Sequence, residues 1–187
     1  MSNINIVIIL GSVRVGRETH KVTTELKKRF HAAGFGNTQV LDLAKYNLPI
    51  AEERFGKTPT AINGIDDAQA ILAKADAFVF VSPEYHGSYS GVLKNFLDYF
   101  SDEFKRKPIG VVSVSTGRFG GINASTEMQL LVLALGAFPM PLKLLVPTVH
   151  FTISEEGEVK EDFLNTNFNK FVQEFSWFAT AIVSHKK

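Results

Sequence analysis

The sequence contains no cysteine among its 187 residues. This absence excludes disulfides, thiolate catalysis, iron–sulfur clusters and cysteine-based zinc sites. Any redox chemistry must therefore come from a bound cofactor. The five histidines show no spacing typical of metal ligands, so we expect no metal site. They are His20, His31, His86, His150 and His185.

The sequence also lacks an excess of charge of one sign and any long apolar run. The formal net charge is +1, and like charges form no long block. Neither nucleic acid nor an anionic membrane is therefore indicated as a partner. No apolar run approaches the length of a membrane span, and residues 1–5 lack the basic start of a signal peptide. We expect a cytoplasmic protein with one domain over residues 1–187.

The most distinctive stretch is the loop 82–91, which follows a predicted strand and precedes a predicted helix. The run from Ala77 to Val81 is short and apolar without alternation, which is typical of a strand buried on both faces of a parallel sheet. Apolar residues three or four apart from Val92 to Phe104 predict an amphipathic helix. Ligands bind at such carboxyl ends of strands. Tyr85 and Tyr89 therefore indicate ligand contact, with packing on the sheet edge as the alternative.

A second special loop, 11–20, follows a strand predicted from Ile4 to Leu10, and a helix is predicted to begin near Arg17 to Lys21. Unpaired N–H groups at a helix start bind anions. Hydroxyl and guanidinium groups in the loop add donors for phosphate oxygens. These groups belong to Ser12, Arg14, Arg17 and Thr19. A plain turn with solvated arginines is the alternative. The loop matches neither the dinucleotide fingerprint nor the NTPase phosphate loop.

The predicted helix after this loop has an apolar face and a charged face. The residues expected to face the core are Val22, Leu26, Phe30 and Ala33. The residues expected to point away from it are Lys21, Glu25, Lys27 and Lys28.

A third loop, 115–121, follows a strand predicted from Pro108 to Ser115 and contains three glycines. Glycine allows the backbone to approach a flat ligand, although a flexible turn would have the same composition. The helix predicted from Ile122 to Leu135 ends in the apolar run 130–135. Because one sheet cannot cover every side of such a helix, we expect either a subunit interface or a fully enclosed helix.

The remaining segments complete an alternation of strands and helices. Strands are predicted from Gln39 to Leu43 and from Leu142 to Phe151, the latter interrupted at Pro147. Helices are predicted from Ile65 to Lys74 and, with a phenylalanine-rich face, over 168–182. The long connection 44–63 is expected to be a flap near the ligand or a disordered surface loop.

Five strands that alternate with helices predict an α/β fold. We expect a doubly wound parallel sheet of order 2-1-3-4-5 in a three-layer α/β/α sandwich. In this order the loops 11–20, 82–91 and 115–121 meet at one crevice beside the first strand. The first loop would bind a phosphate and the other two would hold a flat ring. The ligand that fits this arrangement is FMN.

Three stretches resemble the NADPH-dependent FMN reductase family, which includes quinone, azo-dye and chromate reductases. They are Gly11 to Arg14, Ser82 to Asn95 and Gly117 to Gly121, and the resemblance covers the chain from about Ile4 to Gly136. The central family motif is Pro-Glu-Tyr-Asn-x-Ser-x-Pro-Gly-x-Leu-Lys-Asn. In this chain His86 replaces the asparagine and Ser90 replaces the second proline. The stretch 17–20 replaces the common Ser-x-Asn of the phosphate loop, and Arg17 is expected to take over phosphate charge.

The resemblance implies a flavodoxin-like domain with a five-stranded sheet that binds FMN. It places the phosphate at loop 11–20 and the isoalloxazine ring against 83–87 and 115–121. The implied cofactor-binding residues are Ser12, Arg14, Arg17, Thr19, His20, Pro83, Glu84, Tyr85, His86, Gly87, Ser115, Thr116, Gly117, Gly120 and Gly121. For His86, a hydrogen bond to the flavin and a bond to loop backbone are both open. A homodimer or homotetramer is implied, built partly on the helices after the third and fourth strands.

By the same resemblance the protein is an enzyme that transfers hydride from NADPH or NADH to N5 of the flavin. The electrons then pass to a quinone, an azo compound, free flavin or a similar acceptor, and no catalytic side chain is expected because the flavin carries the chemistry. A flavodoxin-type electron carrier and a non-catalytic flavin-binding sensor are the alternatives. Carriers typically have a hydroxyl-rich phosphate loop and an acidic surface, whereas this chain has arginines and a net charge of +1.

Overall fold

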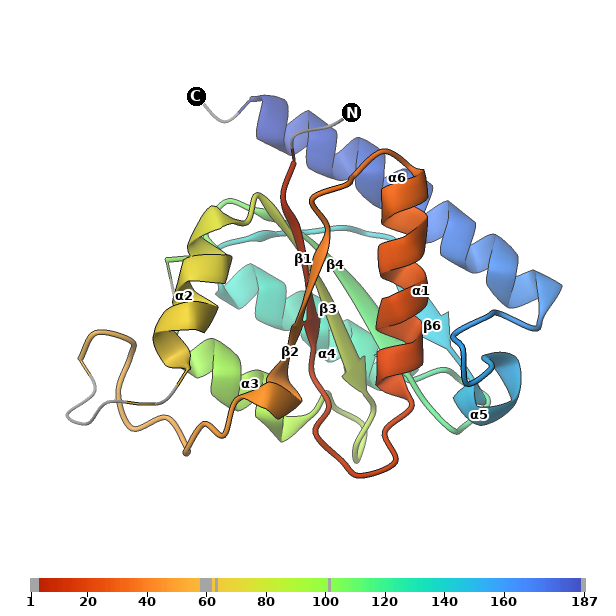
Figure 1. Ribbon diagram of the computed structural model, residues 1–187, viewed down its shortest axis with the longest axis horizontal. Coiled ribbons are helices and arrows are strands. Elements are labelled where there is room, and N and C mark those ends of the chain that lie inside the picture. The colour runs from red at the N-terminus through yellow and green to blue at the C-terminus, as the bar shows by residue number, and fades with distance from the viewer. Residues whose placement is uncertain (1–3, 58–61, 63, 101, 186–187) are drawn as a thin grey trace.

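A computed structural model describes residues 4–57, 62, 64–100 and 102–185, and Figure 1 shows their arrangement. The strands are β1 (Ile6–Leu10), β2 (Gln39–Asp42), β3 (Ala77–Pro83), β4 (Pro108–Val114), β5 (Phe138–Pro139) and β6 (Leu144–Val146). The α-helices are α1 (Thr19–Ala32), α2 (Ile65–Lys74), α3 (Gly91–Asp98), α4 (Ile122–Ala134), α5 (Val149–Thr152) and α6 (Asp162–Ser184). A short 3-10 helix, η1 (Leu43–Lys45), follows β2.

The strands form one parallel sheet in the order β2-β1-β3-β4-β5, which confirms the predicted topology. Two short strands share its last position. β5 pairs with the first two residues of β4, and β6 pairs with the last three. The fifth strand predicted from Leu142 to Phe151 is therefore wrong in its bounds, because β6 ends at Val146, directly before the interruption predicted at Pro147. Pro139 and Pro141 have no N–H to donate to a continuous ladder, and the chain after β6 turns into α5.

Helices cover both faces of the sheet, so the buried side chains form two cores. On one face α1 and α6 pack against Ile6 and Ile8 of β1. On the other face α2, α3 and α4 pack against Val7 and Ile9. In Figure 1 the helices α2 and α3 lie on one side of the strands, and α1 and α6 lie on the other side. Every residue of β1 and of β4 is buried, which explains why β1 is apolar throughout and why Ser113 is the one polar residue of β4.

Two charged residues of α1 lie inside the protein, so the expectation that Lys21 and Glu25 point away from the core is wrong. Their relative exposures are 3% and 6%. Lys21 Nζ forms ion pairs with Glu155 (2.7 Å) and Glu18 (2.6 Å), and the hydrogen bonds with these two carboxylates raise the pKa of Lys21. Glu25 is paired with Arg29 at 2.7 Å. Buried charges are stable when they are paired.

The helix after β3 is shorter than predicted, because α3 ends at Asp98 instead of Phe104. The carbonyl oxygen of Tyr99 accepts a hydrogen bond from the N–H of Phe55 at 2.7 Å. This bond uses an acceptor that a continuing helix would need. Phe100 and Phe104 remain buried beyond the end of the helix.

The long connection 44–63 is described except for residues 58–61 and 63. Its described part lies against α3. The carbonyl oxygen of Pro49 accepts a hydrogen bond from Asn95 Nδ2 at 2.7 Å, and the N–H of residue 51 donates to Asn95 Oδ1 at 2.8 Å. One asparagine therefore fixes the middle of this connection.

Two other helices agree closely with the sequence pattern. α2 has the predicted bounds, and α6 buries Phe168, Phe171 and Phe175 in the first core.

α4 leaves Leu130 and Leu133 56% and 58% exposed. The alternative of a fully enclosed α4 is therefore wrong.

At Gly110 in β4, α6 lies so close to the sheet that a side chain has no room. A Cβ atom there would lie 2.9 Å from ring atoms of both Phe171 and Phe175. We expect Gly110→Ala to lower the free energy of unfolding by about 1–3 kcal/mol, measured by urea denaturation, because it overpacks the core. Gly36→Ala is the matched control, since a Cβ atom meets open space there. Equal losses in the two variants would contradict this account of the packing.

Candidate functional site

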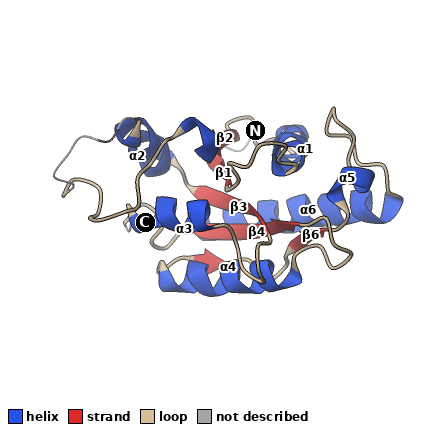
Figure 2. Ribbon diagram, turned by 90° about the horizontal axis from the view of Figure 1, so that it is seen from below, coloured by secondary structure: helices blue, strands red, loops and turns tan. Residues whose placement is uncertain are grey.

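A cavity of about 230 Å³ lies at the carboxyl ends of β1, β3 and β4. Figure 1 shows the loops after these strands at the lower end of the sheet, and Figure 2 views the molecule from that end. The cavity is lined by Ser12, Arg14, Val15, Gly16, Arg17, Glu18, Thr19, Pro83, Glu84, Tyr85, Val114, Ser115, Thr116 and Val149. All three predicted loops therefore meet at one site, at the switch point of the sheet.

Many of the predicted site residues line this cavity. They are Ser12, Arg14, Arg17, Thr19, Pro83, Glu84, Tyr85, Ser115 and Thr116. His20, His86, Gly87, Gly117, Gly120 and Gly121 lie in the same loops but are not among the lining residues. The described residues of 44–63 do not line it either. Val149, at the start of α5, lines the cavity although nothing in the sequence connects it with the site.

Ser12 presents an unused hydrogen-bonding group to the site. It is 1% exposed, and its Oγ has no hydrogen-bond partner among the described residues. Leaving a buried hydroxyl unpaired costs about 1–3 kcal/mol, and such groups are rare in native proteins. Beside it, α1 begins at Thr19 without a side-chain cap from Glu18. Ser12 and the uncapped helix start together suit an anion.

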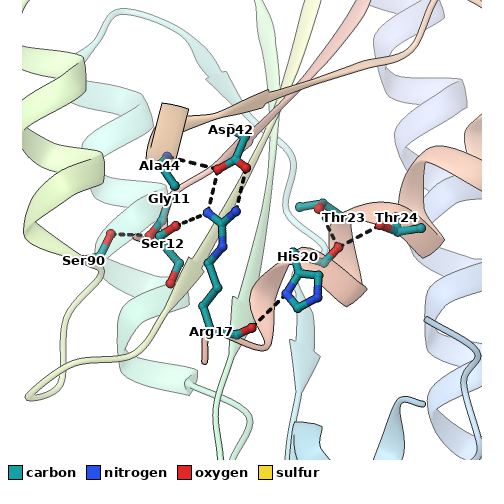
Figure 3. Close-up of polar contacts among 9 residues, drawn as sticks. All are labelled: Gly11, Ser12, Arg17, His20, Thr23, Thr24, Asp42, Ala44 and Ser90. Carbon is teal, nitrogen blue, oxygen red and sulfur yellow. Dashed lines mark hydrogen bonds and ion pairs between the residues drawn. The ribbon is translucent and has the colours of Figure 1, made fainter. Parts of the chain in front are cut away.

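Arg17 fixes the first loop to the end of β2, as Figure 3 shows. Its Nη1 and Nη2 donate to the two carboxylate oxygens of Asp42, each at 2.6 Å. Nη1 also donates to the carbonyl oxygen of Ser12. The N–H of Ala44 donates to Asp42 Oδ1 at 3.0 Å. The bidentate pair therefore holds the backbone beside Ser12 in one position.

The pKa values of this pair reflect the same contacts. The hydrogen bond with Asp42 raises the pKa of Arg17. Burial acts to raise the pKa of Asp42, but the hydrogen bonds from Arg17 and Ala44 and the charge of Arg17 bring it below its ordinary value. Since Asp42 matches the charge of Arg17, binding of a phosphate by Arg17 stays a prediction. Asp42 was not predicted as part of the site, although it is an acidic residue at the end of the second predicted strand.

The other charged residues of the first loop differ in whether their charge is matched. Glu18 forms an ion pair with Lys21 at 2.6 Å. The guanidinium carbon of Arg14 lies 5.4 Å from the centre of the Tyr85 ring. Within the described ranges Arg14 forms no ion pair. Arg14 therefore brings to the cavity a positive charge that no carboxylate in the described part of the chain pairs with.

Ser90 stands where the family motif has proline, and its hydrogen bonds explain the difference. Its Oγ donates to the carbonyl oxygen of Gly11 at 2.6 Å, a bond drawn in Figure 3. Its N–H donates to Ser82 Oγ at 2.9 Å. Its Oγ also accepts from the N–H of Leu93 at 3.3 Å, as the N-cap of α3. Ser90 thus ties loop 82–91 to the first loop through groups that proline lacks.

The four residues from Tyr85 to Ser88 form a tight turn. The N–H of Tyr85 donates to the carbonyl of Ser88 at 2.8 Å, and the N–H of Ser88 donates back at 3.1 Å. His86 and Gly87 have φ values of 52° and 79°, as in a type I′ turn. Asparagine and glycine prefer these two positions. The exposed His86 therefore occupies a turn position that favours the asparagine of the family motif.

The turn predicts the effect of replacing His86. His86→Asn is expected to leave the free energy of unfolding unchanged or to raise it by up to about 1 kcal/mol, because asparagine adopts positive φ readily. His86→Val is expected to lower it by about 1–2 kcal/mol, because a β-branched residue is strained there. Thermal unfolding checks both. A larger loss for asparagine than for valine would show that the His86 side chain itself stabilises the turn.

Gly120 (φ 62°) and Gly121 (φ 79°) pack so closely on β6 and β4, respectively, that a side chain has no room. A Cβ atom on Gly121 would lie 2.9 Å from Ser113 Cβ, and Ser113 Oγ donates to the carbonyl of Gly120 at 2.7 Å. Glu84 accepts a hydrogen bond from the N–H of Ala124 at 3.0 Å, in the first turn of α4. The second and third loops are therefore held together at the cavity, and contact of the glycines with a flat ligand stays a prediction.

Comparison with protein families matches residues 4–150 to the model for NADPH-dependent FMN reductase. The chain belongs to this family. It is 32% identical over 157 residues to an FMN-dependent NADPH-azoreductase of Staphylococcus saprophyticus, with 80% of each chain covered. It is 30% identical over 158 residues to an NADPH azoreductase of Bacillus sp. strain OY1-2, with 84% of this chain and 83% of the relative covered.

Solved structures show that the fold is shared. FerB, a flavoenzyme NAD(P)H:(acceptor) oxidoreductase from Paracoccus denitrificans, superposes with a TM-score of 0.79 at 22% identity. The match covers 95% of this chain and 98% of FerB. A flavodoxin, WrbA-like protein from Agrobacterium tumefaciens matches with a TM-score of 0.61 at 19% identity, over 98% of this chain and 100% of that protein. The flavodoxin-like fold predicted for this chain is confirmed.

As a member of the NADPH-dependent FMN reductase family, the protein is an oxidoreductase that uses FMN and NADPH. In the described part of the chain, the helices are too short or too polar to cross a membrane. The same residues contain no group of three or more His, Asp or Glu side chains arranged to hold a metal ion.

Proposed function

We propose that the cavity binds FMN, with the phosphate at loop 11–20 and the flat ring between loops 82–91 and 115–121. The observation that carries this proposal is the buried Ser12 Oγ, which lacks a partner among the described residues beside the uncapped start of α1. Arg14 adds a positive charge with no carboxylate partner in the described ranges. The other proposed contacts are Arg17, Thr19, His20, Pro83, Glu84, Tyr85, His86, Gly87, Ser115, Thr116, Gly117, Gly120 and Gly121.

Bound FMN supplies hydride and electron transfer chemistry that no side chain of the protein provides. The protein positions the cofactor and shapes the pocket. Ser12 and Arg14 hold the phosphate, and Tyr85 gives the pocket an aromatic wall. Glu84 keeps loop 82–91 on the start of α4 through its bond with Ala124. We propose no acid, base or nucleophile among the lining residues.

For the electron acceptor we propose an azo compound, with quinones and free flavin as further candidates. Support comes from two relatives at 30–32% identity that are named azoreductases. The test measures NADPH oxidation by the FMN-loaded protein with an azo dye, a quinone or free FMN and no partner protein. We expect acceptor-dependent oxidation with ping-pong kinetics. Oxidation that requires a partner protein would support an electron carrier, and bound FMN that NADPH cannot reduce would support a sensor.

We also propose a homodimer or homotetramer in which α4 contacts a second copy. Ile122, Leu130 and Leu133 of this helix are 47%, 56% and 58% exposed, and exposed apolar patches are typical of interfaces. Leu130→Glu is expected to convert the oligomer to monomer in sedimentation velocity experiments. Trp177→Glu should leave it intact, because Trp177 is 69% exposed on α6, which covers the opposite face of the sheet from α4. A wild-type monomer would contradict the proposal.

Residues 1–187 would act as one domain in the cytoplasm, where reduced pyridine nucleotides are available.

A further inference from the structure

A second cavity, of about 290 Å³, lies beside the β4–α4 loop. It is lined by Arg118, Phe119, Leu142, Lys143, Leu145, Pro147, Phe163, Asn167 and Lys170. These residues come from the β4–α4 loop, from β6 with its flanking residues, and from the first turns of α6. β6 and the start of α6 lie on the same side of the molecule in Figure 1. The site proposed for FMN does not use this cavity.

Two aromatic side chains of the second cavity are largely in solvent. Phe119 and Phe163 are 75% and 70% exposed. Both line the same cavity, so they form part of one apolar surface. Large apolar side chains gathered at a concave surface are typical of ligand contact. A flat aromatic group would cover them.

The cavity is also positively charged. Arg118, Lys143 and Lys170 line it, and none of its lining residues is acidic. Across the described chain, none of these three cations forms an ion pair. Lys143 Nζ donates one hydrogen bond, to the hydroxyl of Thr126 at 2.9 Å. Three cations without carboxylate partners beside exposed aromatic rings suit a ligand that is both aromatic and anionic.

The second cavity is close to the first along the chain. Ser115 and Thr116 line the first cavity, and Arg118 and Phe119 line the second. The Cα atoms of Thr116 and Arg118 are at most about 7 Å apart, the length of two extended residues. One elongated ligand can therefore reach both cavities across a single loop.

We propose that the second cavity binds the adenosine 2′-phosphate end of NADPH and makes the enzyme prefer NADPH over NADH. Adenine would pack on Phe119 and Phe163, and the 2′-phosphate, with a charge of about −1.5 to −2, would meet Arg118 and Lys170. The nicotinamide end would reach the first cavity. This inference rests on the proposed FMN site, because the two ends of one molecule must serve both cavities.

The test removes the positive charge and compares the two nucleotides. Arg118→Ala/Lys170→Ala in the FMN-loaded enzyme is expected to lower kcat/KM for NADPH by at least about tenfold relative to kcat/KM for NADH. Independently of turnover, adenosine 2′,5′-bisphosphate is titrated into the FMN-loaded protein by calorimetry. The double variant should bind this probe at least about tenfold more weakly than the wild type. Phe119→Ala should weaken both the probe and AMP, because it removes the surface for adenine.

Lys57→Ala/Lys74→Ala is the matched control, since it removes the same charge from exposed residues outside this cavity. If the control variant lowers NADPH preference and probe affinity equally, the effect is due to the net charge of the protein, and the proposal is overturned. Failure of the wild-type protein to bind the probe would also overturn the proposal. The same holds if the only change in the double variant is a higher KM for an anionic aromatic acceptor. Failure of the FMN site would be seen separately, as absence of the flavin absorption band from protein that still binds the probe.

Discussion

Replacing Ser12 with alanine is expected to weaken FMN binding by about tenfold to a hundredfold without destabilising the protein in the absence of FMN. FMN binding should weaken because a hydrogen bond to a charged group contributes about 1.5–3 kcal/mol. The FMN-free protein should keep its stability because the Ser12 Oγ forms no hydrogen bond within the described chain. Quenching of flavin fluorescence measures the affinity, and urea denaturation of FMN-free protein measures the stability. Removing an unpaired buried hydroxyl should leave that stability equal or higher.

Ser113 provides the contrast, because it is equally buried but already paired. Its Oγ donates to the carbonyl of Gly120 at 2.7 Å. Ser113→Ala is therefore expected to lower the stability of the FMN-free protein by about 1–3 kcal/mol, since it leaves a buried carbonyl unsatisfied. Equal destabilisation by Ser12→Ala, or unchanged FMN affinity in that variant, would show that Ser12 has a structural role instead.

Replacing Asp42 with alanine is the second change with a large expected effect. It leaves the guanidinium of Arg17 without its partner, and losing one member of a buried pair costs about 3–5 kcal/mol. The side chains of Arg17 and Asp42 are 19% and 16% exposed, so we expect a loss of about 2 kcal/mol in the free energy of unfolding. FMN affinity should also fall, because the loop that holds Ser12 loses its attachment to β2.

A double-mutant cycle separates the pair from its surroundings. Arg17→Met/Asp42→Ala is expected to be more stable than Asp42→Ala alone, because it removes the uncompensated charge. Urea denaturation measures all the variants. Strictly additive losses would mean that the two residues stabilise the loop independently, contrary to the bidentate geometry.

The same pair predicts a pH dependence. The pKa of Asp42 in the folded protein lies below its ordinary value of 3.8, so its contribution is complete above that value and is lost as pH falls through the folded pKa. The stability difference between the wild type and Asp42→Asn should therefore be constant near neutral pH and shrink in acid. Denaturation at a series of pH values checks this. A difference that grows in acid would have the wrong sign.

Elements with a strong local pattern were predictable from the sequence. β1 and β3 are buried on both faces, so their apolar runs identify them without any knowledge of the fold. α2 was predicted to its end residues, and its charges agree with the helix dipole: Asp66 and Asp67 lie in the first turn and Lys74 in the last. The strand order then places the three loops at one crevice, which is why the sequence could predict that residues of these loops line one cavity.

Features that depend on contacts between distant residues could not be predicted. Arg17 pairs with a carboxylate 25 residues away, and Lys21 pairs with a carboxylate 134 residues away. No periodicity contains that information. The same holds for Val149, which enters the cavity from a helix outside the three loops. Local patterns predicted loop 11–20 as the phosphate site that we propose, while tertiary contacts decide which of its charged side chains lack a partner of opposite charge.

The proposed reductase function is tested by the visible spectrum of the FMN-loaded protein during anaerobic addition of NADPH. We expect purified protein to retain the absorption band of oxidised flavin and NADPH to bleach this band rapidly without a partner protein. Ser12→Ala should retain less flavin in the same preparation. Protein that binds no FMN, or a flavin band that NADPH leaves unchanged, would contradict the proposed site and its function as a reductase.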